Sequence, residues 1–424
     1  MSRRDTDMTS NQGDGSTNQG SGGASSMLSR RKYLAGTTAA GITATFAGCM
    51  GGGDDGLTVG YALPFTGTYA FLGESIVNGF EMFLEQQGGE INGEEVNTVQ
   101  LDTEADTDRG VDVTRELLVE ESADAIVGPV SSAVAIAMMG IVEAESSAIW
   151  LNANAGDYRV TEEGCLDYHF RTSFNDWQTS APLAEWVYDN VADNVCLAYA
   201  DYAFGQNSKE FFGEAFEEAG GEIVEEVGIP LGTDNYSTYL GDIEDSGADA
   251  VYSFFAGDDA VNYVSDFNDF GLNEEMTQTG SGFLLSEDTL PAQGDAAEGM
   301  YSLLHYTTTQ DTERNREFVD NYSEMYDHES ANVYACQGYD SAQAFSAAVE
   351  ETGGTDPDEM ADTLAGLELD SPRGHFQFNP DTHEAIQDMH IREVVESDDE
   401  DFEVENEVID TIEQVEGPDW GCSL

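Results

Sequence analysis

Two serines stand directly after a short apolar run that has the character of a buried strand. Gly128-Pro129-Val130-Ser131-Ser132 connects the run at 125–128 to an apolar stretch with helical spacing. Hydroxyl groups and the free backbone N–H groups of a helix N-terminus together bind anions. Ser131 and Ser132 are therefore candidates for holding a carboxylate, and the alternative is an ordinary serine N-cap.

Small polar and aromatic residues follow two further apolar runs. Asn152 and Asn154 come after the run at 148–151, and Tyr202 and Phe204 come after the run at 194–199. In open α/β sheets, ligands bind beyond the carboxyl ends of the strands, where such residues converge. We expect the asparagines to share the anion with the serines and the two aromatic residues to form a wall of the site.

Motifs for catalysis or metal binding are absent from the sequence. It contains no phosphate-binding P-loop, no GxSxG nucleophile elbow and no HExxH, and its six histidines are scattered. Acidic residues alternate over 102–108 as in a calcium loop, but the glycine and the terminal glutamate of such a loop are missing. We expect a binding protein without enzymatic activity, cofactor or metal.

Apolar periodicity predicts two series of alternating strands and helices from residue 57 onward. The first has strands at 57–63, 96–101, 125–128 and 148–151 and helices at 73–87, 111–121 and 132–145. The second has helices at 179–190, 205–219 and 236–245 and strands at 194–199, 222–227 and 250–255. Helices at 313–326 and 334–352 and a β-hairpin within 375–395 complete the pattern.

Two such series predict an α/β protein with two doubly wound parallel-sheet lobes joined by a hinge. The carboxyl ends of the strands in two facing lobes form a cleft that closes by hinge motion. This arrangement positions the serines, asparagines and aromatic residues around one ligand.

The N-terminus is typical of an export signal. Residues 1–26 form a polar extension that we expect to be disordered, and 27–49 contain a twin-arginine pattern at Arg30-Arg31 and a short apolar run. That run is too short to cross a bilayer, which needs about 20 apolar residues. It ends in Phe46-Ala47-Gly48-Cys49, followed by a Gly-rich tether at 50–56. We expect a lipid on Cys49 to anchor the protein on the outer face of the membrane.

Four further cysteines, Cys165, Cys196, Cys336 and Cys422, could form up to two disulfides in three connectivities or remain free thiols. Their spacing does not choose among these arrangements.

The charge balance is strongly acidic. The sequence has 85 Asp and Glu against 14 Lys and Arg, a net charge of -71, yet 40% of its residues are hydrophobic. The apolar content predicts a folded chain, and the acidic surface is typical of proteins from very salty surroundings. Nucleic acid is excluded as a partner because phosphate binding needs a basic surface.

A set of short motifs, in this order, resembles the solute-binding proteins of branched-chain amino acid ABC importers. That leucine/isoleucine/valine-binding family has a type I periplasmic fold, and the likeness here takes a salt-adapted, haloarchaeal-like form. It covers roughly 57–395. The motifs are LPFTGTYA at 63–70, AIVGPVSS at 125–132, FRTS at 170–173, DYAFG at 201–205, GYD at 338–340 and SPRG at 371–374.

The resemblance implies roles for individual residues. Ser132 or Ser131 would hold the ligand carboxylate, and Asn152 and Asn154 stand where the family has an Ala and a Thr that bind the ligand. Phe204 and Tyr334 would be aromatic walls, and Tyr69 lies on the first loop, where a cleft tyrosine is usual.

One position departs from the family. Ser281 stands near the place of the family's glutamate, which pairs with the ligand ammonium. The resemblance implies a branched-chain or other amino acid as ligand and ABC permease subunits as partners. The alternatives are an aromatic acid, an amide or urea, or a ligand-sensing receptor without a transport role. Residues 370–382 look most like the aromatic-acid-binding branch.

The predicted organisation places 57–171 and 306–371 in lobe 1, 172–305 and 372–415 in lobe 2, and 416–424 in a tail.

We predict that the fold requires molar salt. Repulsion among the carboxylates is screened within about 3 Å in 1 M salt but reaches about 30 Å in 0.01 M salt. Circular dichroism during dialysis from molar to low salt should show the melting temperature falling until the protein unfolds. A melting temperature independent of salt would contradict this explanation of the -71 charge.

Overall fold

The computed structural model describes residues 56–67, 69–162, 164–327, 329–397 and 402–424. The predicted extension at 1–26, the export signal at 27–49 with Cys49, and the tether through residue 55 lie outside these residues. Within the described part of the chain, no helix has the length and apolar character needed to cross a membrane.

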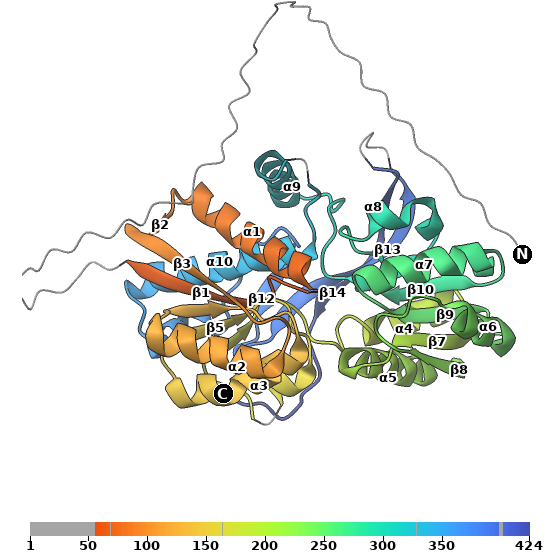
Figure 1. Ribbon diagram of the computed structural model, residues 1–424, viewed down its shortest axis with the longest axis horizontal. Coiled ribbons are helices and arrows are strands. Elements are labelled where there is room, and N and C mark those ends of the chain that lie inside the picture. The colour runs from red at the N-terminus through yellow and green to blue at the C-terminus, as the bar shows by residue number, and fades with distance from the viewer. Residues whose placement is uncertain (1–55, 68, 163, 328, 398–401) are drawn as a thin grey trace, which may run out of the picture. The chain divides into compact units, whose positions relative to one another are not determined.

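The chain forms two α/β lobes, each built on its own sheet (Figure 1). This architecture confirms the predicted fold class. The sheet of lobe 1 has the order β2-β3-β1-β4-β5-β6, and only β2 is antiparallel to its neighbour. Its strands are β1 (Leu57–Leu63), β2 (Glu90–Ile91), β3 (Glu94–Asp102), β4 (Ala125–Val127), β5 (Ile149–Asn152) and β6 (His169–Arg171).

The sheet of lobe 2 has the order β12-β13-β11-β10-β9-β7-β8, with β14 paired to β13. The strands from β11 to β8 are parallel, and β12, β13 and β14 add antiparallel pairs, including the predicted hairpin. Its strands are β7 (Asn194–Ala200), β8 (Glu222–Ile229), β9 (Ala250–Phe254), β10 (Thr277–Ser281), β11 (Tyr301–Leu304), β12 (Phe376–Phe378), β13 (Ala385–Glu396) and β14 (Val404–Val415).

Helices cover both faces of each sheet because successive strand residues point to opposite faces. In lobe 1, Tyr61 and Leu63 pack toward α1 and α10, while Ala62 packs toward α2 and α3. Figure 1 shows these helices beside the lobe 1 strands. In lobe 2, α4 and α5 cover one face, and α6 and α7 cover the other. The helices are α1 (Ala70–Gln86), α2 (Thr107–Arg115), α3 (Ser132–Glu145), α4 (Ala181–Asn190), α5 (Ala203–Ala219), α6 (Ser237–Ser246), α7 (Asp258–Phe270), α8 (Leu290–Gln293), α9 (Glu313–Met325), α10 (Val333–Thr352) and α11 (Pro357–Leu364).

Helices α1 and α10 approach closely because each places a glycine at the contact. A Cβ added to Gly79 would lie 1.8 Å from the Ala335 carbonyl oxygen, and one added to Gly338 would lie 1.9 Å from that of Ile76. Any side chain at either position would therefore force the two helices apart.

Sequence periodicity predicts most of these elements within a few residues. Helix α2 begins four residues earlier than predicted because the Asp106 side chain accepts a hydrogen bond from Arg109 N–H and caps it, and a π-helical turn, Glu116–Glu120, follows. The prediction missed β2, β6, α7, β10, α8, β11, α11 and β14.

Buried arginines hold the segments where the chain passes between the lobes. Arg373 donates to the carbonyl oxygens of Thr172 (2.9 Å) and Ser173 (3.2 Å), which follow β6. Its guanidinium also lies 2.8 Å from the Asp340 carboxylate, and both side chains are fully buried. Arg392, on β13, donates to the carbonyl of Tyr306 (3.0 Å), which follows β11. Each arginine therefore pairs with residues far away in the sequence at a place where the chain passes between the lobes.

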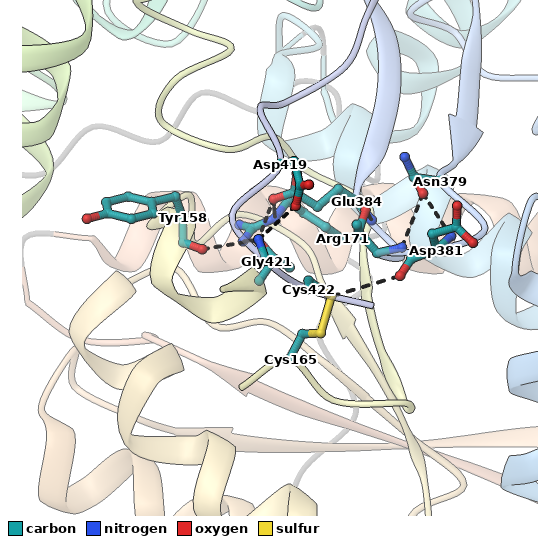
Figure 2. The surroundings of a disulfide bond; sticks show 11 residues. Tyr158, Cys165, Arg171, Asn379, Asp381, Glu384, Asp419, Gly421 and Cys422 are labelled. Atoms are coloured by element: carbon teal, nitrogen blue, oxygen red, sulfur yellow. Dashed lines mark hydrogen bonds and ion pairs between the residues drawn. A yellow bond between two sulfur atoms is a disulfide. The ribbon is translucent and has the colours of Figure 1, made fainter. Parts of the chain in front are cut away.

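A disulfide joins Cys165 to Cys422 (Figure 2). Cys196 and Cys336 are buried free thiols. The structure thus selects one bridge from the alternatives that the sequence leaves open.

Candidate functional site

The site lies at the strand ends where each lobe changes its winding direction. In lobe 1, β1 lies between β3 and β4, and in lobe 2, β7 lies between β8 and β9. The connections that leave β1 and β4 turn to opposite faces of their sheet, as do those that leave β7 and β9, and each pair leaves a crevice between them. Both crevices contribute to one cavity: Tyr69 and Ser131 follow β1 and β4, and Tyr202 and Phe254 lie at or after the ends of β7 and β9.

The cavity has a volume of about 110 Å³. An apolar cavity of about 150 Å³ holds benzene, so this volume is on the scale of a single ring. Among the described residues, no lining side chain carries a formal charge. The lining comprises Tyr69, Leu72, Val130, Ser131, Ser132, Ala133, Asn154, Gly156, Phe174, Tyr202, Ala203, Phe204, Phe254, Ala256, Phe283 and Tyr334.

One side of the cavity is the N-terminus of α3. Ser131 is the N-cap residue but its side chain makes no capping hydrogen bond, and Ser132 is the first helical residue. The first helical backbone bond runs from Ala135 N–H to the Ser131 carbonyl, so the N–H groups of Ser132 and Ala133 precede the helical ladder. Because Ser132 Oγ accepts a bond from Asp157 N–H at 3.3 Å, its own proton is available for donation. This side offers hydroxyl and N–H donors to an anion.

The opposite side of the cavity is aromatic. The rings of Phe204 and Phe254 have centroids 4.6 Å apart, and those of Phe174 and Phe283 are 4.9 Å apart. A glycine permits this packing, since a Cβ on Gly156 would lie 2.4 Å from the Phe174 ring. These rings contact one another at tilted angles and form an apolar wall against which another ring can pack.

Two tyrosines complete the lining. Tyr69 and Tyr202 share a hydrogen bond, and burial raises the pKa of both phenols. Both therefore remain neutral and keep their capacity to donate or accept a hydrogen bond in the physiological pH range.

Most predicted site residues line the cavity. Seven of the nine do so: Tyr69, Ser131, Ser132, Asn154, Tyr202, Phe204 and Tyr334. Asn152 and Ser281 lie outside the lining. The Asn152 side-chain amide N–H donates to the Ala155 carbonyl at 2.9 Å, and the Asn152 backbone carbonyl accepts from Ser173 Oγ at 2.9 Å. These bonds stabilise the loop that follows β5. Ser281 is fully buried at the end of β10.

Acidic residues that could replace the family's ammonium-binding glutamate lie elsewhere. Asp201 is exposed and bonded to Gln206, and Asp340 is paired with Arg373. Asp258 starts α7 and is not part of the lining. The described lining has no carboxylate to neutralise an ammonium group.

Phe174, Phe254 and Phe283 line the cavity but were not predicted. Phe254 is the last residue of β9, a strand that the sequence predicts. Its place at a predicted strand end could therefore have identified it as a site residue. Phe174 and Phe283 follow β6 and β10, short strands that periodicity did not detect.

Asp176 is a buried carboxylic acid beside the site. Its N–H donates to the Gly156 carbonyl at 2.7 Å, and its Oδ2 accepts from Asn207 on α5 at 2.7 Å. Burial, assisted by the nearby Asp157 carboxylate, raises the pKa of Asp176 to about 8. The protonated acid thus connects a loop of lobe 1 to a helix of lobe 2.

A charge-free cavity between two α/β lobes, with donors on one side, defines a solute-binding protein of the type I periplasmic fold. Residues 56–400 match the family model described as "Periplasmic binding protein", and the chain belongs to that family. It is an ABC-type solute-binding protein.

Sequence and structural relatives agree with this assignment. The Leu/Ile/Val-binding protein homolog 6 of Brucella melitensis is 30% identical over 369 residues, covering 86% of this chain and 93% of the relative. A Rhodopseudomonas palustris ABC solute-binding protein solved with benzoate has a TM-score of 0.80 and 29% identity, covering 87% of this chain and 100% of that one. Another, from strain BisB5 of the same species and solved with 3,4-dihydroxybenzoic acid, has a TM-score of 0.81 and 28% identity, covering 85% and 98%.

We predict that Asp176→Asn removes a pH dependence of stability. Because the folded state raises this pKa to about 8, its contribution is present below the ordinary Asp value of about 3.9 and is lost as the pH rises through about 8. Calorimetric melting in molar salt at about pH 7 and about pH 8.5 should show the native protein losing stability with rising pH and the variant losing less. This window lies above the ordinary histidine pKa of about 6.5, so the buried histidines do not contribute. Equal slopes for the two proteins would contradict the assignment.

Proposed function

We propose that this protein captures a monocyclic aromatic carboxylic acid and delivers it to an ABC importer. The observation that carries the proposal is the absence of any carboxylate from the described lining of a cavity that has seven aromatic side chains. An α-amino acid brings an ammonium group, whose burial without a partner is costly. An aromatic acid brings only a carboxylate and a ring, and the cavity has a suitable side for each.

The carboxylate would bind at the N-terminus of α3, where a helix of 14 residues adds its dipole to the donors of Ser131 and Ser132. The ring would pack against the aromatic side of the cavity, which Phe204, Phe254 and Phe283 line. The two Rhodopseudomonas palustris relatives, solved with benzoate and 3,4-dihydroxybenzoic acid, support the same ligand class. The Brucella relative is named for leucine, isoleucine and valine, so leucine is the competing ligand to test.

The partners in this proposal are the permease subunits of the importer. The anchor is a lipid on Cys49 after export, supported by the lipobox-like Phe46-Ala47-Gly48-Cys49 behind the twin-arginine pattern. The salt-adapted surface follows from the -71 charge.

We predict that Ser132→Ala weakens benzoate binding by about 1.5–3 kcal/mol, roughly 10- to 150-fold, because the hydroxyl donates to a charged group. Calorimetric titration in molar salt with benzoate, 4-hydroxybenzoate, leucine and urea would measure this and rank the ligands. Ser237→Ala is the matched control, since Ser237 is the first residue of α6 and does not line the cavity.

Tight leucine binding with no response to benzoate would overturn the aromatic-acid proposal. Equal affinities of native protein and Ser132→Ala for benzoate would overturn the placement of the carboxylate at α3.

We predict that membrane-derived protein begins at a lipid-modified Cys49. Mass spectrometry of the N-terminal peptide should show the added lipid mass, and Cys49→Ser should release the protein from the membrane. A mature chain that starts elsewhere with an unmodified Cys49 would contradict the anchor.

A further inference from the structure

The C-terminal tail, residues 416–424, runs from lobe 2 to lobe 1. It leaves β14, whose last residue Val415 pairs with Gln387 in the sheet of lobe 2. It ends on lobe 1, where Cys422 is bonded to Cys165 in the segment between β5 and β6 (Figure 2). The Leu424 N–H donates to the Asp381 carbonyl at 3.0 Å and secures the last residue. The tail is therefore a further connection between the lobes, and it is fastened covalently.

Trp420 in this tail contacts an aromatic ring from each lobe. Its ring centroid lies 4.7 Å from that of Tyr158 and 5.7 Å from that of Phe211. The Tyr158 and Phe211 rings also meet directly, at 5.6 Å and nearly perpendicular. Tyr158 begins the short 3-10 helix Tyr158–Thr161 of lobe 1, and Phe211 lies on α5 of lobe 2. Three rings thus form one cluster across the two lobes.

Both segments in this cluster carry walls of the ligand cavity. On the lobe 1 side, Asn154 and Gly156 line the cavity, and Asp157, which bonds to Ser132 Oγ, directly precedes Tyr158. On the lobe 2 side, Phe204 lines the cavity from the first turn of α5, two helical turns before Phe211. Phe204 and Phe211 are seven residues apart and lie on similar faces of α5. A displacement of Phe211 therefore also displaces the helix face that carries Phe204.

We propose that the tail is a clasp that holds the two lobes together around the cavity, with Trp420 as a positioning residue for binding. Trp420 holds Tyr158 and Phe211 together, and with them the loop at 152–157 and the start of α5. The Cys165–Cys422 disulfide keeps Trp420 in place, because residues after β14 have no sheet partners beyond the bridge of Gly421 to Glu162 among the described residues. Removing the ring or the disulfide would let the two walls separate and the ligand leave. The ligand part of this inference rests on the proposed function.

Ligand dissociation is the first measurement. Stopped-flow displacement of 4-hydroxybenzoate from the full mature chain in molar salt should show dissociation about 2- to 10-fold faster in Trp420→Ala, the scale of an aromatic contact. The change stays on this scale although Trp420 contacts two rings, because Tyr158 and Phe211 still meet directly. Cys422→Ser should have a similar effect, and Trp420→Phe should restore most of the slow rate. The control is Trp186→Ala, since Trp186 contacts Tyr301 within lobe 2 and has no ring contact with the tail.

A purely structural role would lower the melting temperature of Trp420→Ala without changing the dissociation rate, and that result would overturn the clasp. Small-angle scattering of the ligand-free proteins is the second measurement. We expect a larger radius of gyration for Trp420→Ala and Cys422→Ser than for the native protein and Trp186→Ala. Equal radii in all four would also overturn the clasp. Should no aromatic acid bind, the proposed function fails, while the scattering comparison still tests the clasp.

Discussion

The pairing of buried arginines with backbone carbonyls at the hinge is the interaction on which the rest of the structure depends. A chain that passes between two sheets leaves carbonyl groups without strand partners, and burying them unpaired is costly. Arginine meets this need with five donors in a planar fork, and its own charge is balanced by one buried carboxylate. Arg171, Arg373 and Arg392 are all fully buried in a chain with only 14 basic residues. Arg171 donates to the carbonyl of Phe174 at 3.0 Å, and Arg392 to that of Gly282 at 3.0 Å. These bonds also position Phe174 and Phe283, the residue after Gly282, in the cavity lining.

The charged residues and the candidate binding site occupy different parts of the protein. The surface carries most of the 85 acidic residues, whereas the described lining of the cavity carries none. An anionic ligand approaching so acidic a protein is repelled at long range, and salt removes that repulsion while leaving short-range hydrogen bonds intact. In the proposed site, the dipole of α3 and the serine donors would then act on the carboxylate at short range. Under the proposed function, molar salt would screen the acidic surface and also allow a carboxylate to reach the site.

Local pattern predicted the elements that carry a continuous apolar run or a clear helical period, including the fully buried strands β5 and β9. It failed at short strands without such a run and where acidic residues interrupt the apolar pattern. Helix α3 was predicted to its exact bounds of 132–145, because an apolar run begins after Ser131 and ends before polar residues. Strand β14 was missed because several of its residues are exposed and acidic. Its alternation of apolar and acidic residues therefore resembles the sequence of a solvated tail. Helix α7 was missed because its buried Tyr263, Val264 and Phe267 are interleaved with aspartates. Short strands such as β6 are defined by their neighbours and have no period of their own.

The sequence by itself determined the fold class, the donors at the start of α3 and the aromatic character of the second lobe's contribution, since these follow from residue types at predicted strand ends. Only the tertiary structure decided which strand ends share a cavity. It placed Asn154 in the lining and Asn152 outside it, and it put Phe283 into the cavity in preference to the nearby Ser281. It also paired Cys165 with Cys422 across 257 residues of sequence. The physical reason is that lateral strand order and the close packing of distant segments arise from non-local burial, which spacing along the chain does not record.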